Sequence, residues 1–427
     1  MEIGPPISIE IAVERGGRAA CRVERVRGRL LMAKLACPYC YHRFPASNLW
    51  FQCTGRPAPG KEKCRKVVDP ERQRLTGYAP ASWPVFAAPK ALLGRTPRRA
   101  PCPDCGTVSG IRACPVCHTP LPANFADSRS PLIGVVGGKN AGKTVYTTVL
   151  VHELRHNIRR RFDADISFAG EQAGVGTAQW LARYEQALFD DRALFESTAS
   201  SADGIRIPLV MQWRQPRVQF GRQVHNTTTL SFYDAAGEDM TTQEFVNSQA
   251  YLTAADGLIV LLDPFQLPGA QDRIAVPDVG RRDAEPPVNV LNRVTEMLRS
   301  SVGLSDRKKI STPIAVVFSK IDAFFGMLGD NHPLLRPPAT GPEYDEAGGQ
   351  DADEHLRALL AEFGADDLDG HLRAHYQTFR YFAVSSLGAE PDYGRKQINP
   401  AGVRPFRVDE PLLWLLSHFG IIERSRR

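Results

Sequence analysis

The stretch from Gly137 to Thr144 constrains this chain more than any other. It reads GGKNAGKT and matches the pattern G-x-x-x-x-G-K-[ST]. An apolar run, PLIGVVG, precedes it, and a helical pattern follows to about residue 160. This order predicts a phosphate-binding loop whose backbone amides converge on the phosphates. The residues expected to line it are Gly137, Gly138, Lys139, Asn140, Ala141, Gly142, Lys143 and Thr144.

Two side chains of this loop would act on the phosphates. We expect the Lys143 ammonium to reach the terminal phosphates, where it would stabilise charge on the transferring phosphoryl group. The Thr144 hydroxyl would bind Mg2+. A chance glycine turn is the alternative, and the flanking strand and helix argue against it.

From residue 131 onward, apolar strand patterns alternate with helical stretches. This alternation predicts an α/β domain over residues 131–427, with a doubly wound, mostly parallel sheet and helices on both faces. Insertions enlarge it at residues 163–196, 264–286 and 324–376. They could be partner surfaces or decoration without function.

The stretch TTTLSFYDAAGED ends a predicted strand with Asp234 and Gly237. In such a D-x-x-G turn the carboxylate would hold Mg2+ through water, and the glycine amide would contact the γ-phosphate. Thr227 to Thr229 fall within the strand itself, so we interpret them as structural.

Two later strand ends indicate which base is selected. TPIAVVFSKIDAF ends in Ser319, Lys320 and Asp322. An aspartate here can accept hydrogen bonds from guanine N1 and N2, whereas adenine offers no matching pair of donors. Lys320 would lie along the base. The last strand, YFAVSSLG, leads into a tight turn at Ser385, Ser386 and Leu387. That turn is suited to present a backbone amide to guanine O6.

These elements, in this order, resemble the Ras-like GTPases of the TRAFAC class. The resemblance covers about residues 131–427. CPVCHTPLP, ADGLIVLLDP and RVDEPLLWLL are also similar to bacterial proteins of the double-GTPase type. The resemblance implies GTP binding, slow hydrolysis and a switch function.

Three positions depart from the family pattern. Ser319 stands where Asn or Thr is usual, and Leu387 where Lys is common. Glu238 follows Gly237 where many relatives have the Gln that orients the attacking water. A carboxylate there could still position water, but it would repel the γ-phosphate, so we expect slow hydrolysis.

The remaining catalytic assignments are less direct. Thr198 precedes the strand GIRIPLVMQW and is the candidate for the Mg2+-contacting threonine of the first switch, the alternative being a solvated loop. No arginine finger is evident in cis, and Arg192 is interpreted as a surface charge. Asn140 occupies the position at which potassium-stimulated TRAFAC GTPases carry an asparagine. K+ is therefore a further candidate cofactor, although an asparagine also suits a turn.

Eight of the nine cysteines form four pairs along the N-terminal region. C-x-x-C turns and their spacing predict two four-thiolate sites, for which zinc is the expected ion. The first predicted set is Cys37, Cys40, Cys53 and Cys64. The second is Cys102, Cys105, Cys114 and Cys117. His42 could replace a cysteine in the first set.

These pairs suggest a domain division ahead of the body. It comprises an N-terminal extension (residues 1–36), a zinc module (37–69), a Pro/Arg-rich linker (70–101) and a zinc ribbon (102–121). Zinc would supply most of the folding free energy of such small segments. The aromatic residues Tyr41, Phe44, Trp50 and Phe51 are expected to form their core rather than a base-stacking platform.

Charge distinguishes the two halves of the chain. Residues 1–130 contain 21 Lys+Arg and 9 Asp+Glu, whereas the whole chain has a net charge of +6. A basic front end favours an anionic partner, either an acidic protein surface or nucleic acid. No signal peptide or membrane-spanning run is apparent, so a cytoplasmic protein is expected.

Three functions remain open from the sequence. The first is a regulatory switch with Mg2+-dependent GTPase activity, whose zinc region docks an unknown protein effector or regulator. The second is a non-hydrolysing nucleotide-binding adapter. The third is a nucleic-acid-binding zinc protein with a GTPase module.

Overall fold

The computed structural model describes residues 34–87, 97–122, 125, 129–169, 177–194, 208–219, 222–234, 250–274, 276–277, 285–305 and 307–425. The predicted extension, residues 1–36, therefore lies outside the described residues except for its last three positions. No helix in these ranges is both long enough and apolar enough to cross a membrane.

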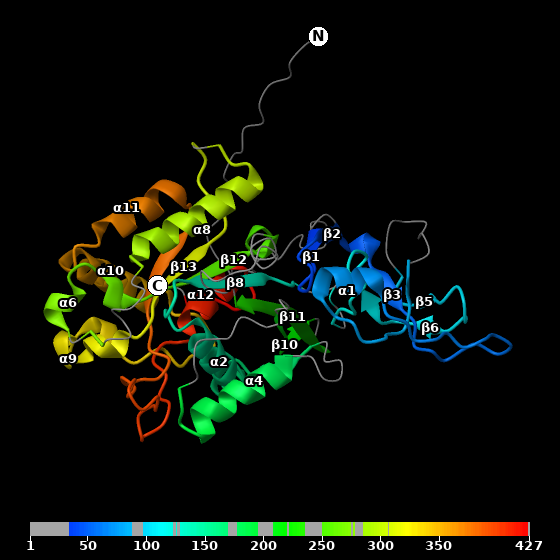
Figure 1. Ribbon diagram of the computed structural model, residues 1–427, viewed down its shortest axis with the longest axis horizontal. Helices are drawn as coiled ribbons and strands as arrows, with labels where there is room; N and C mark the ends of the chain where they lie inside the picture. The colour runs from blue at the N-terminus through cyan, green and yellow to red at the C-terminus, as the bar shows by residue number, and fades with distance from the viewer. Residues whose placement is uncertain are drawn as a thin grey trace, which may run out of the picture. The chain divides into compact units, whose positions relative to one another are not determined.

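A seven-stranded sheet forms the centre of the body, in the order β14-β13-β12-β8-β11-β10-β9 (Figure 1). The strands from β14 to β11 run parallel, and β10 and β9 continue the sheet in antiparallel fashion. This confirms the predicted mostly parallel α/β sheet. The strands are β8 (Leu132–Gly137), β9 (Asp165–Phe168), β10 (Leu209–Gln219), β11 (Arg222–Asp234), β12 (Gly257–Leu262), β13 (Ile314–Phe318) and β14 (Phe379–Ala383).

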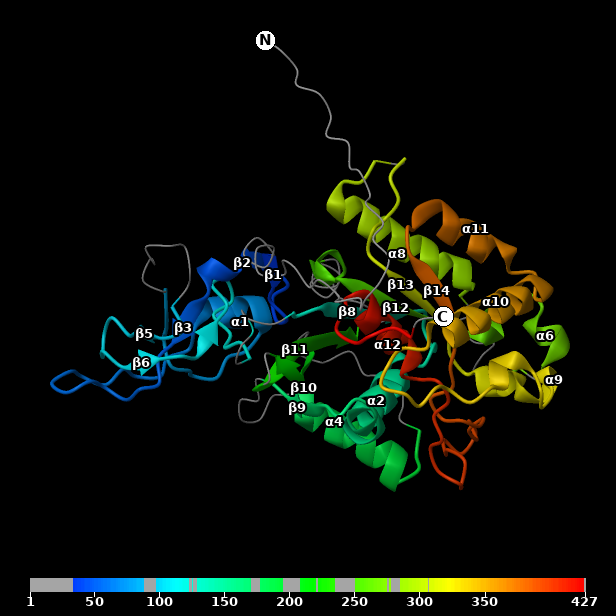
Figure 2. The same ribbon diagram turned by 180° about the vertical axis from the view of Figure 1, so that it is seen from behind.

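Helices cover both faces of this sheet, because its central strands are apolar on both sides. Along β12, Leu258 and Val260 belong to one core, whereas Ile259 and Leu261 belong to the other. Both views show α8, α10 and α11 on one face and α2, α4 and α12 on the other (Figures 1 and 2). These helices are α2 (Lys143–Glu153), α4 (Thr177–Glu185), α8 (Pro287–Val302), α10 (Glu346–Glu362), α11 (Asp366–His375) and α12 (Glu410–His418).

Short helices extend or connect these elements. A π-helical segment, η2 (Leu154–Ile158), and α3 (Arg159–Arg161) continue α2, so the helix ends close to the predicted residue 160. The others are η3 (Gln186–Asp190), η4 (Pro264–Gln266), α6 (Ala270–Arg273), η5 (Ile321–Phe324), α9 (Phe325–Leu328) and η6 (Pro333–Leu335). β9 and α4 lie in the insertion predicted at 163–196, and α10 and α11 lie in that at 324–376.

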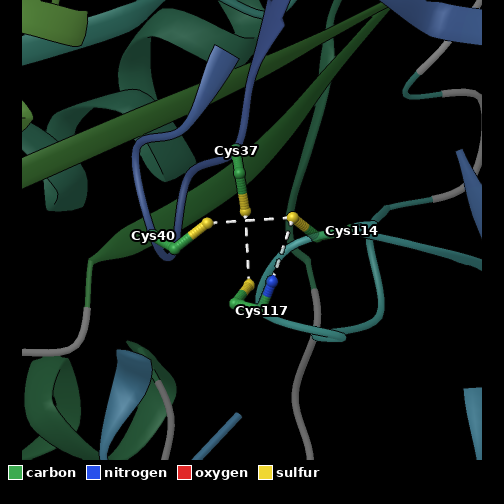
Figure 3. Close-up of side chains that lie close together, drawn as sticks. All are labelled: Cys37, Cys40, Cys114 and Cys117. Carbon is green, nitrogen blue, oxygen red and sulfur yellow. Dashed lines mark hydrogen bonds between the residues drawn. The ribbon is translucent and has the colours of Figure 1, made fainter. Parts of the chain in front are cut away.

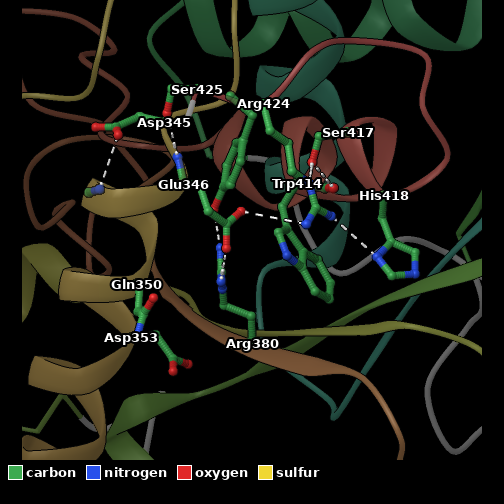
Figure 4. Close-up of polar contacts among 12 residues, drawn as sticks. Asp345, Glu346, Gln350, Asp353, Arg380, Trp414, Ser417, His418, Arg424 and Ser425 are labelled. Carbon is green, nitrogen blue, oxygen red and sulfur yellow. Dashed lines mark hydrogen bonds and ion pairs between the residues drawn. The ribbon is translucent and has the colours of Figure 1, made fainter. Parts of the chain in front are cut away.

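The last described residues attach to the edge of the sheet (Figure 4). Arg380 of β14 donates a hydrogen bond of 2.6 Å to Glu346 at the start of α10. The backbone amide of Glu346 donates in turn to the Ser425 hydroxyl at 3.1 Å. Arg424 donates to the hydroxyl of Ser417 in α12 at 3.0 Å. These bonds connect elements that belong to opposite layers.

The cysteine-rich region is built from very short strands. A three-stranded sheet has the order β4-β3-β7, and two separate pairs join β1 to β2 and β5 to β6. The elements are β1 (Lys34–Ala36), β2 (Arg43–Pro45), η1 (Ala46–Asn48), β3 (Trp50–Gln52), α1 (Pro70–Thr76), β4 (Val85–Phe86), β5 (Ala100–Pro101), β6 (Val108–Ser109) and β7 (Arg112–Ala113).

Residues 70–101, predicted to be an extended linker with one short docked segment, contain α1, β4 and β5 in their described part, residues 70–87 and 97–101. Asp69 caps α1 by accepting from the Arg72 amide at 2.9 Å, and β4 pairs with β3. Because β3 also pairs with β7, residues 37–69 and 102–121 belong to one folded unit rather than two modules. The sequence signal was the capping aspartate before Pro70, which is favoured at the first position of a helix.

Candidate nucleotide site and cysteine centres

The predicted phosphate-binding loop connects β8 to α2. A side chain at Gly137 would put its Cβ 2.4 Å from the Leu261 carbonyl oxygen of β12, so only glycine fits beside that strand. Gly142 has a φ of +77° and caps α2. The Lys143 ammonium donates to the carbonyls of Gly137 at 3.1 Å and Gly138 at 2.8 Å. It therefore lies over the loop, as a phosphate-binding lysine must.

Other residues of the loop also have defined positions. Lys139 is partly exposed, and Asn140 is exposed with a φ of +60°, a left-handed conformation that asparagine tolerates well. Ala141 and Thr144 are buried, and the Thr144 carbonyl accepts from the Thr148 hydroxyl at 2.8 Å. The loop conformation thus depends on glycine or asparagine at its two left-handed positions.

Ser319 connects the end of β13 to this loop. Its buried hydroxyl donates to the Ala141 carbonyl at 2.9 Å and lies 3.2 Å from the Leu262 carbonyl at the end of β12. Ser319 therefore joins two strand ends to the phosphate loop, although it replaces the usual Asn or Thr.

Lys320 follows in a left-handed conformation, with a φ of +56°. Its ammonium donates to Asp263 at 2.7 Å and lies 5.1 Å from the centroid of the Phe265 ring. Asp263 is buried and also accepts from the Phe265 amide at 3.1 Å. Sequence reasoning did not assign Asp263 to the site, although its position at the end of the run GLIVLLD was a usable signal.

Asp322 lies in η5, directly after β13. Burial raises the pKa of its carboxyl above the ordinary value, and a hydrogen bond from Ser385 partly offsets this. Burial and the neighbouring Asp322 likewise raise the pKa of Glu390. The carboxylate that would read guanine therefore lies among the Ser385 hydroxyl, the Lys320 ammonium and the acidic Glu390.

The turn after β14 holds that hydroxyl in place. Ser385 is fully buried, and its Oγ accepts from the Gly388 amide at 2.7 Å. Gly388 has a φ of +81°, and a Cβ there would lie 1.9 Å from the Arg404 carbonyl oxygen. Ser386 is partly exposed, and the Leu387 carbonyl accepts from the Arg404 amide at 2.9 Å. The structure thus brings the two predicted base-reading segments together through Ser385 and Asp322.

Several predicted residues lie outside the described residues. They are Thr198, Gly237 and Glu238, together with the side chain of Asp234. The backbone of Asp234 ends β11 beside Val135 of β8, two residues before the loop begins. Thr227 to Thr229 are buried within β11, as expected for structural residues. Arg192 donates to the exposed carbonyl of Pro400 at 2.6 Å, in agreement with its assignment as a surface charge.

The first cysteine centre combines the two ends of the cysteine-rich region (Figure 3). It contains Cys37, Cys40, Cys114 and Cys117. The Cys37 and Cys117 sulfurs are 3.7 Å apart, as are those of Cys40 and Cys114. Four sulfurs at about 2.3 Å from a tetrahedral zinc ion would be about 3.8 Å apart, so these thiols fit such an ion.

The second centre contains Cys53, Cys64, Cys102 and Cys105. Its measured sulfur distances are 3.5 Å for Cys53–Cys105 and 3.9 Å for Cys64–Cys102. All eight cysteines are free thiols, and these distances are far longer than a disulfide bond of about 2.05 Å. This centre therefore has the same geometry as the first.

The predicted grouping of the cysteines is wrong. The sequence analysis combined Cys37 and Cys40 with Cys53 and Cys64, and Cys102 and Cys105 with Cys114 and Cys117, because neighbours along the chain were assumed to share an ion. In the structure the outer pairs share one centre and the inner pairs share the other. Pairing of β3 with both β4 and β7 brings the distant pairs together.

His42 and the aromatic residues meet the remaining expectations in part. His42 belongs to neither centre, and its Nδ1 is 3.0 Å from the Cys40 carbonyl oxygen. Tyr41, Phe44 and Phe51 are buried, and Trp50 stacks on His118 with ring centroids 5.0 Å apart. Phe44 and Phe51 thus lie in the two apolar clusters of the region, whereas Tyr41 belongs to a cluster of the body.

Comparison with known proteins then identifies the family. A family model described as Double-GTPase 2 matches residues 131–369, which is more than half of the chain. The chain belongs to the Double-GTPase 2 family. The predicted P-loop GTPase domain of the double-GTPase type is thereby confirmed.

One curated relative covers most of the chain. It is named "Putative ESX-1 scaffolding and assembly protein SaeC", from Mycolicibacterium smegmatis, and is 26% identical over 339 residues. The match includes 73% of this chain and 81% of SaeC. It therefore extends beyond the part matched by the family model.

Similar solved structures are more distant. The GTPase-like domain of S. cerevisiae Ski7 bound to GTP is 12% identical, with a TM-score of 0.32, and the match covers 70% of this chain and 51% of that one. Translation elongation factor SelB from Methanococcus maripaludis is 14% identical, with a TM-score of 0.26, covering 70% of this chain and 36% of that one. The chain thus spans about half or less of the length of these structures.

Proposed function

We propose that this Double-GTPase 2 protein is a guanine-nucleotide switch that hydrolyses GTP slowly. The observation that carries the proposal is the hydrogen bond from Ser319 to Ala141, which fixes the base-reading strand end to the phosphate loop. Asp322 follows three residues later, and the amide of the preceding Ile321 donates to the Val384 carbonyl at 3.1 Å, next to Ser385. The base and the phosphates would therefore be bound by segments that are hydrogen-bonded to each other.

Each part of the nucleotide has a candidate partner. The Asp322 carboxylate would accept from guanine N1–H and N2–H, and the backbone amide of Leu387 would face O6. The methylene groups of Lys320 would lie along the base while Asp263 holds its ammonium. Lys143 and the loop amides would neutralise the phosphates.

Hydrolysis would use residues around the terminal phosphate. Thr144, Asp234 and Thr198 would hold Mg2+, which neutralises charge on the phosphates when it is bound. Glu238 would position the attacking water, at the cost of repelling the γ-phosphate. Asn140, exposed at the tip of the loop, would contribute an oxygen to K+ if the ion binds there.

Calorimetry with purified protein tests this proposal directly. We expect GTP and GDP to bind and ATP to bind at least about a hundredfold more weakly, because adenine leaves the half-buried Asp322 carboxylate without its donors. Phosphate release over many turnovers should disappear in Lys143→Ala. Equal affinity for ATP and GTP would refute guanine selection.

A non-hydrolysing adapter is the second candidate, and the name of the SaeC relative favours it. Scaffolding requires binding of partners but no turnover. Glu238 also fits this function because its charge opposes a hydrolytic arrangement. GTP binding without phosphate release, in K+ as well as in Na+, would support the adapter.

Both cysteine centres are proposed to hold zinc as a structural ion. Free thiols at these distances suit a reducing compartment, so we propose a cytoplasmic location. The pairing can be tested with double serine variants. Changing Cys37 and Cys117 together should remove one zinc ion and leave the other. Changing Cys37 and Cys53 should remove both, and the opposite pattern would refute the pairing.

The cysteine-rich region is proposed to couple the nucleotide state to a protein partner. Tyr41 packs edge-on against Tyr251, with ring centroids 5.2 Å apart, and Arg43 bonds to Asp256 at 2.9 Å. Tyr251 lies in the helical residues 250–254, which follow the segment containing Gly237 along the chain. A change around the γ-phosphate could therefore reach the cysteine-rich region through Tyr251.

A protein partner fits this region better than nucleic acid. Trp83 is a partly exposed ring beside two lysines, but a Cβ on Gly55 would lie 2.2 Å from it. The Lys63 and Lys66 ammonium groups lie 5.6 and 5.5 Å from its centroid. The ring is therefore poorly available for base stacking. Strong, salt-dependent RNA or DNA binding by the full chain would reverse this preference.

A further inference from the structure

An ion pair lies directly beside the phosphate loop. Glu285 precedes α8, and Arg293 lies two turns into that helix. The two guanidinium nitrogens of Arg293 donate to the two oxygens of Glu285 at 2.5 and 3.1 Å. The Glu285 side chain is only 13% exposed, whereas that of Arg293 is 41% exposed. Water therefore screens the carboxylate poorly, and Arg293 neutralises it through both of its oxygens.

Glu285 reaches the loop at Gly138. A Cβ on Gly138 would lie 3.2 Å from a carboxylate oxygen of Glu285 and 3.3 Å from a methyl group of Val290. The carbonyl of the same glycine accepts from the Lys143 ammonium at 2.8 Å. Gly138 thus lies between Glu285 and Lys143. The negative charge of Glu285 is on one side of this glycine, and the phosphate-binding ammonium of Lys143 is on the other.

We infer that Arg293 and Glu285 are positioning residues that set the preference for GTP over GDP. The inference rests on the proposed guanine-nucleotide binding. Phosphates on the loop bring several negative charges close to Glu285, and a poorly screened carboxylate repels them. Arg293 offsets this repulsion because Glu285 holds its guanidinium, and with it a positive charge, beside the loop. The effect is larger for a triphosphate because it carries more charge.

Removal of Arg293 exposes the repulsion. In Arg293→Ala the carboxylate faces the phosphates alone, so we expect GTP affinity to fall by about tenfold or more and GDP affinity to fall less. Adding Glu285→Gln to this variant removes the carboxylate that repels the phosphates. The GTP affinity of the double variant should therefore be within about threefold of the wild-type affinity.

Competition binding of fluorescently labelled GTP and GDP to the full chain measures both affinities. The loss in Arg293→Ala should shrink as salt is raised, and Arg293→Lys should retain most of the affinity because it keeps the charge. Arg273→Ala is the matched control, since Arg273 pairs with Glu362 at 3.2 Å on an exposed surface. It should leave the GTP to GDP ratio unchanged.

The outcomes separate this inference from the proposed function. If the wild type binds guanine nucleotides but the ratio is the same in Arg293→Ala, the inference is overturned and the proposed function stands. If Glu285→Gln does not restore the GTP affinity of Arg293→Ala, the ion pair is structural, and the inference is likewise overturned. A wild type that binds neither nucleotide would overturn both. Should Arg293→Ala not fold, Arg293→Gln takes its place: a reduced GTP preference at low salt would support the inference, and an unchanged preference would refute it.

Discussion

Replacement of Asp322 by asparagine should weaken GTP binding while stabilising the nucleotide-free protein. The carboxylate would accept two hydrogen bonds from guanine, and an amide in its place turns one acceptor into a donor that faces a donor. Losing one hydrogen bond to a charged group costs about 1.5–3 kcal/mol, and the guanine donor left unsatisfied costs about another 1–3 kcal/mol, which together give about 3–6 kcal/mol. That corresponds to a roughly 10²- to 10⁴-fold rise in Kd.

The stability effect has the opposite sign. Burial raises the pKa of Asp322, which means that the folded, nucleotide-free protein binds this proton more tightly than the unfolded chain does. The contribution of Asp322 to stability is therefore fully present below its unfolded pKa and lost as pH rises through its folded pKa. At neutral pH the asparagine variant avoids this loss, so we expect its Tm to equal or exceed that of the wild type.

Titration calorimetry with GTP and thermal unfolding without nucleotide test the two effects together. Glu390→Gln is the matched control, because Glu390 lies near Asp322 and shares its raised pKa but is assigned no contact with the base. It should leave GTP affinity within about threefold of the wild type. A change of less than about fivefold in Asp322→Asn, or an equal loss in the control, would refute the assignment of Asp322 to guanine.

Other predictions follow from the same site and from the cysteine centres. GTP affinity should fall as pH is lowered towards the raised pKa of Asp322, because protonation removes an acceptor, and Asp322→Asn should flatten this profile. Ser319→Ala should cost about 1–2 kcal/mol of unfolding free energy, since the buried carbonyl of Ala141 loses its donor, and chemical denaturation would detect this. Faster GTP turnover in K+ than in Na+, lost in Asn140→Ala, is expected if Asn140 contributes to a cation site. Chelation of zinc should release thiols in two steps and lower the Tm of the full chain, and an unchanged Tm would argue against structural metal.

The nucleotide-binding body was largely predictable because its signals are local. The phosphate loop, its flanking strand and helix, and the strand ends at Ser319 and Asp322 are each contained in fewer than about twenty residues. Parallel strands bring their carboxyl ends to one edge of a sheet, so placing these segments together required only the fold class. The contact between Ser385 and Asp322 follows from the same rule.

The parts that sequence reasoning missed depend on long-range pairing. Nothing local to Cys53 or Cys64 indicates that Cys102 and Cys105 complete their centre, because that requires β3 to pair with two distant strands. Glu285 was not predicted as a neighbour of the phosphate loop for a similar reason. It lies far from Gly138 along the chain and matches no motif, and only the position of the start of α8 beside the phosphate loop brings its carboxylate to Gly138.

The nesting of the cysteine pairs has a consequence for synthesis of the chain. Cys37 and Cys117 are 80 residues apart, so at roughly 5–20 residues per second the first thiols leave the ribosome several seconds before their partners. Cys53 and Cys64 emerge within that interval and can capture metal together with Cys37 and Cys40. Native pairing then requires an exchange of thiolates on the ion, and the rate of that exchange would limit how quickly newly made protein matures.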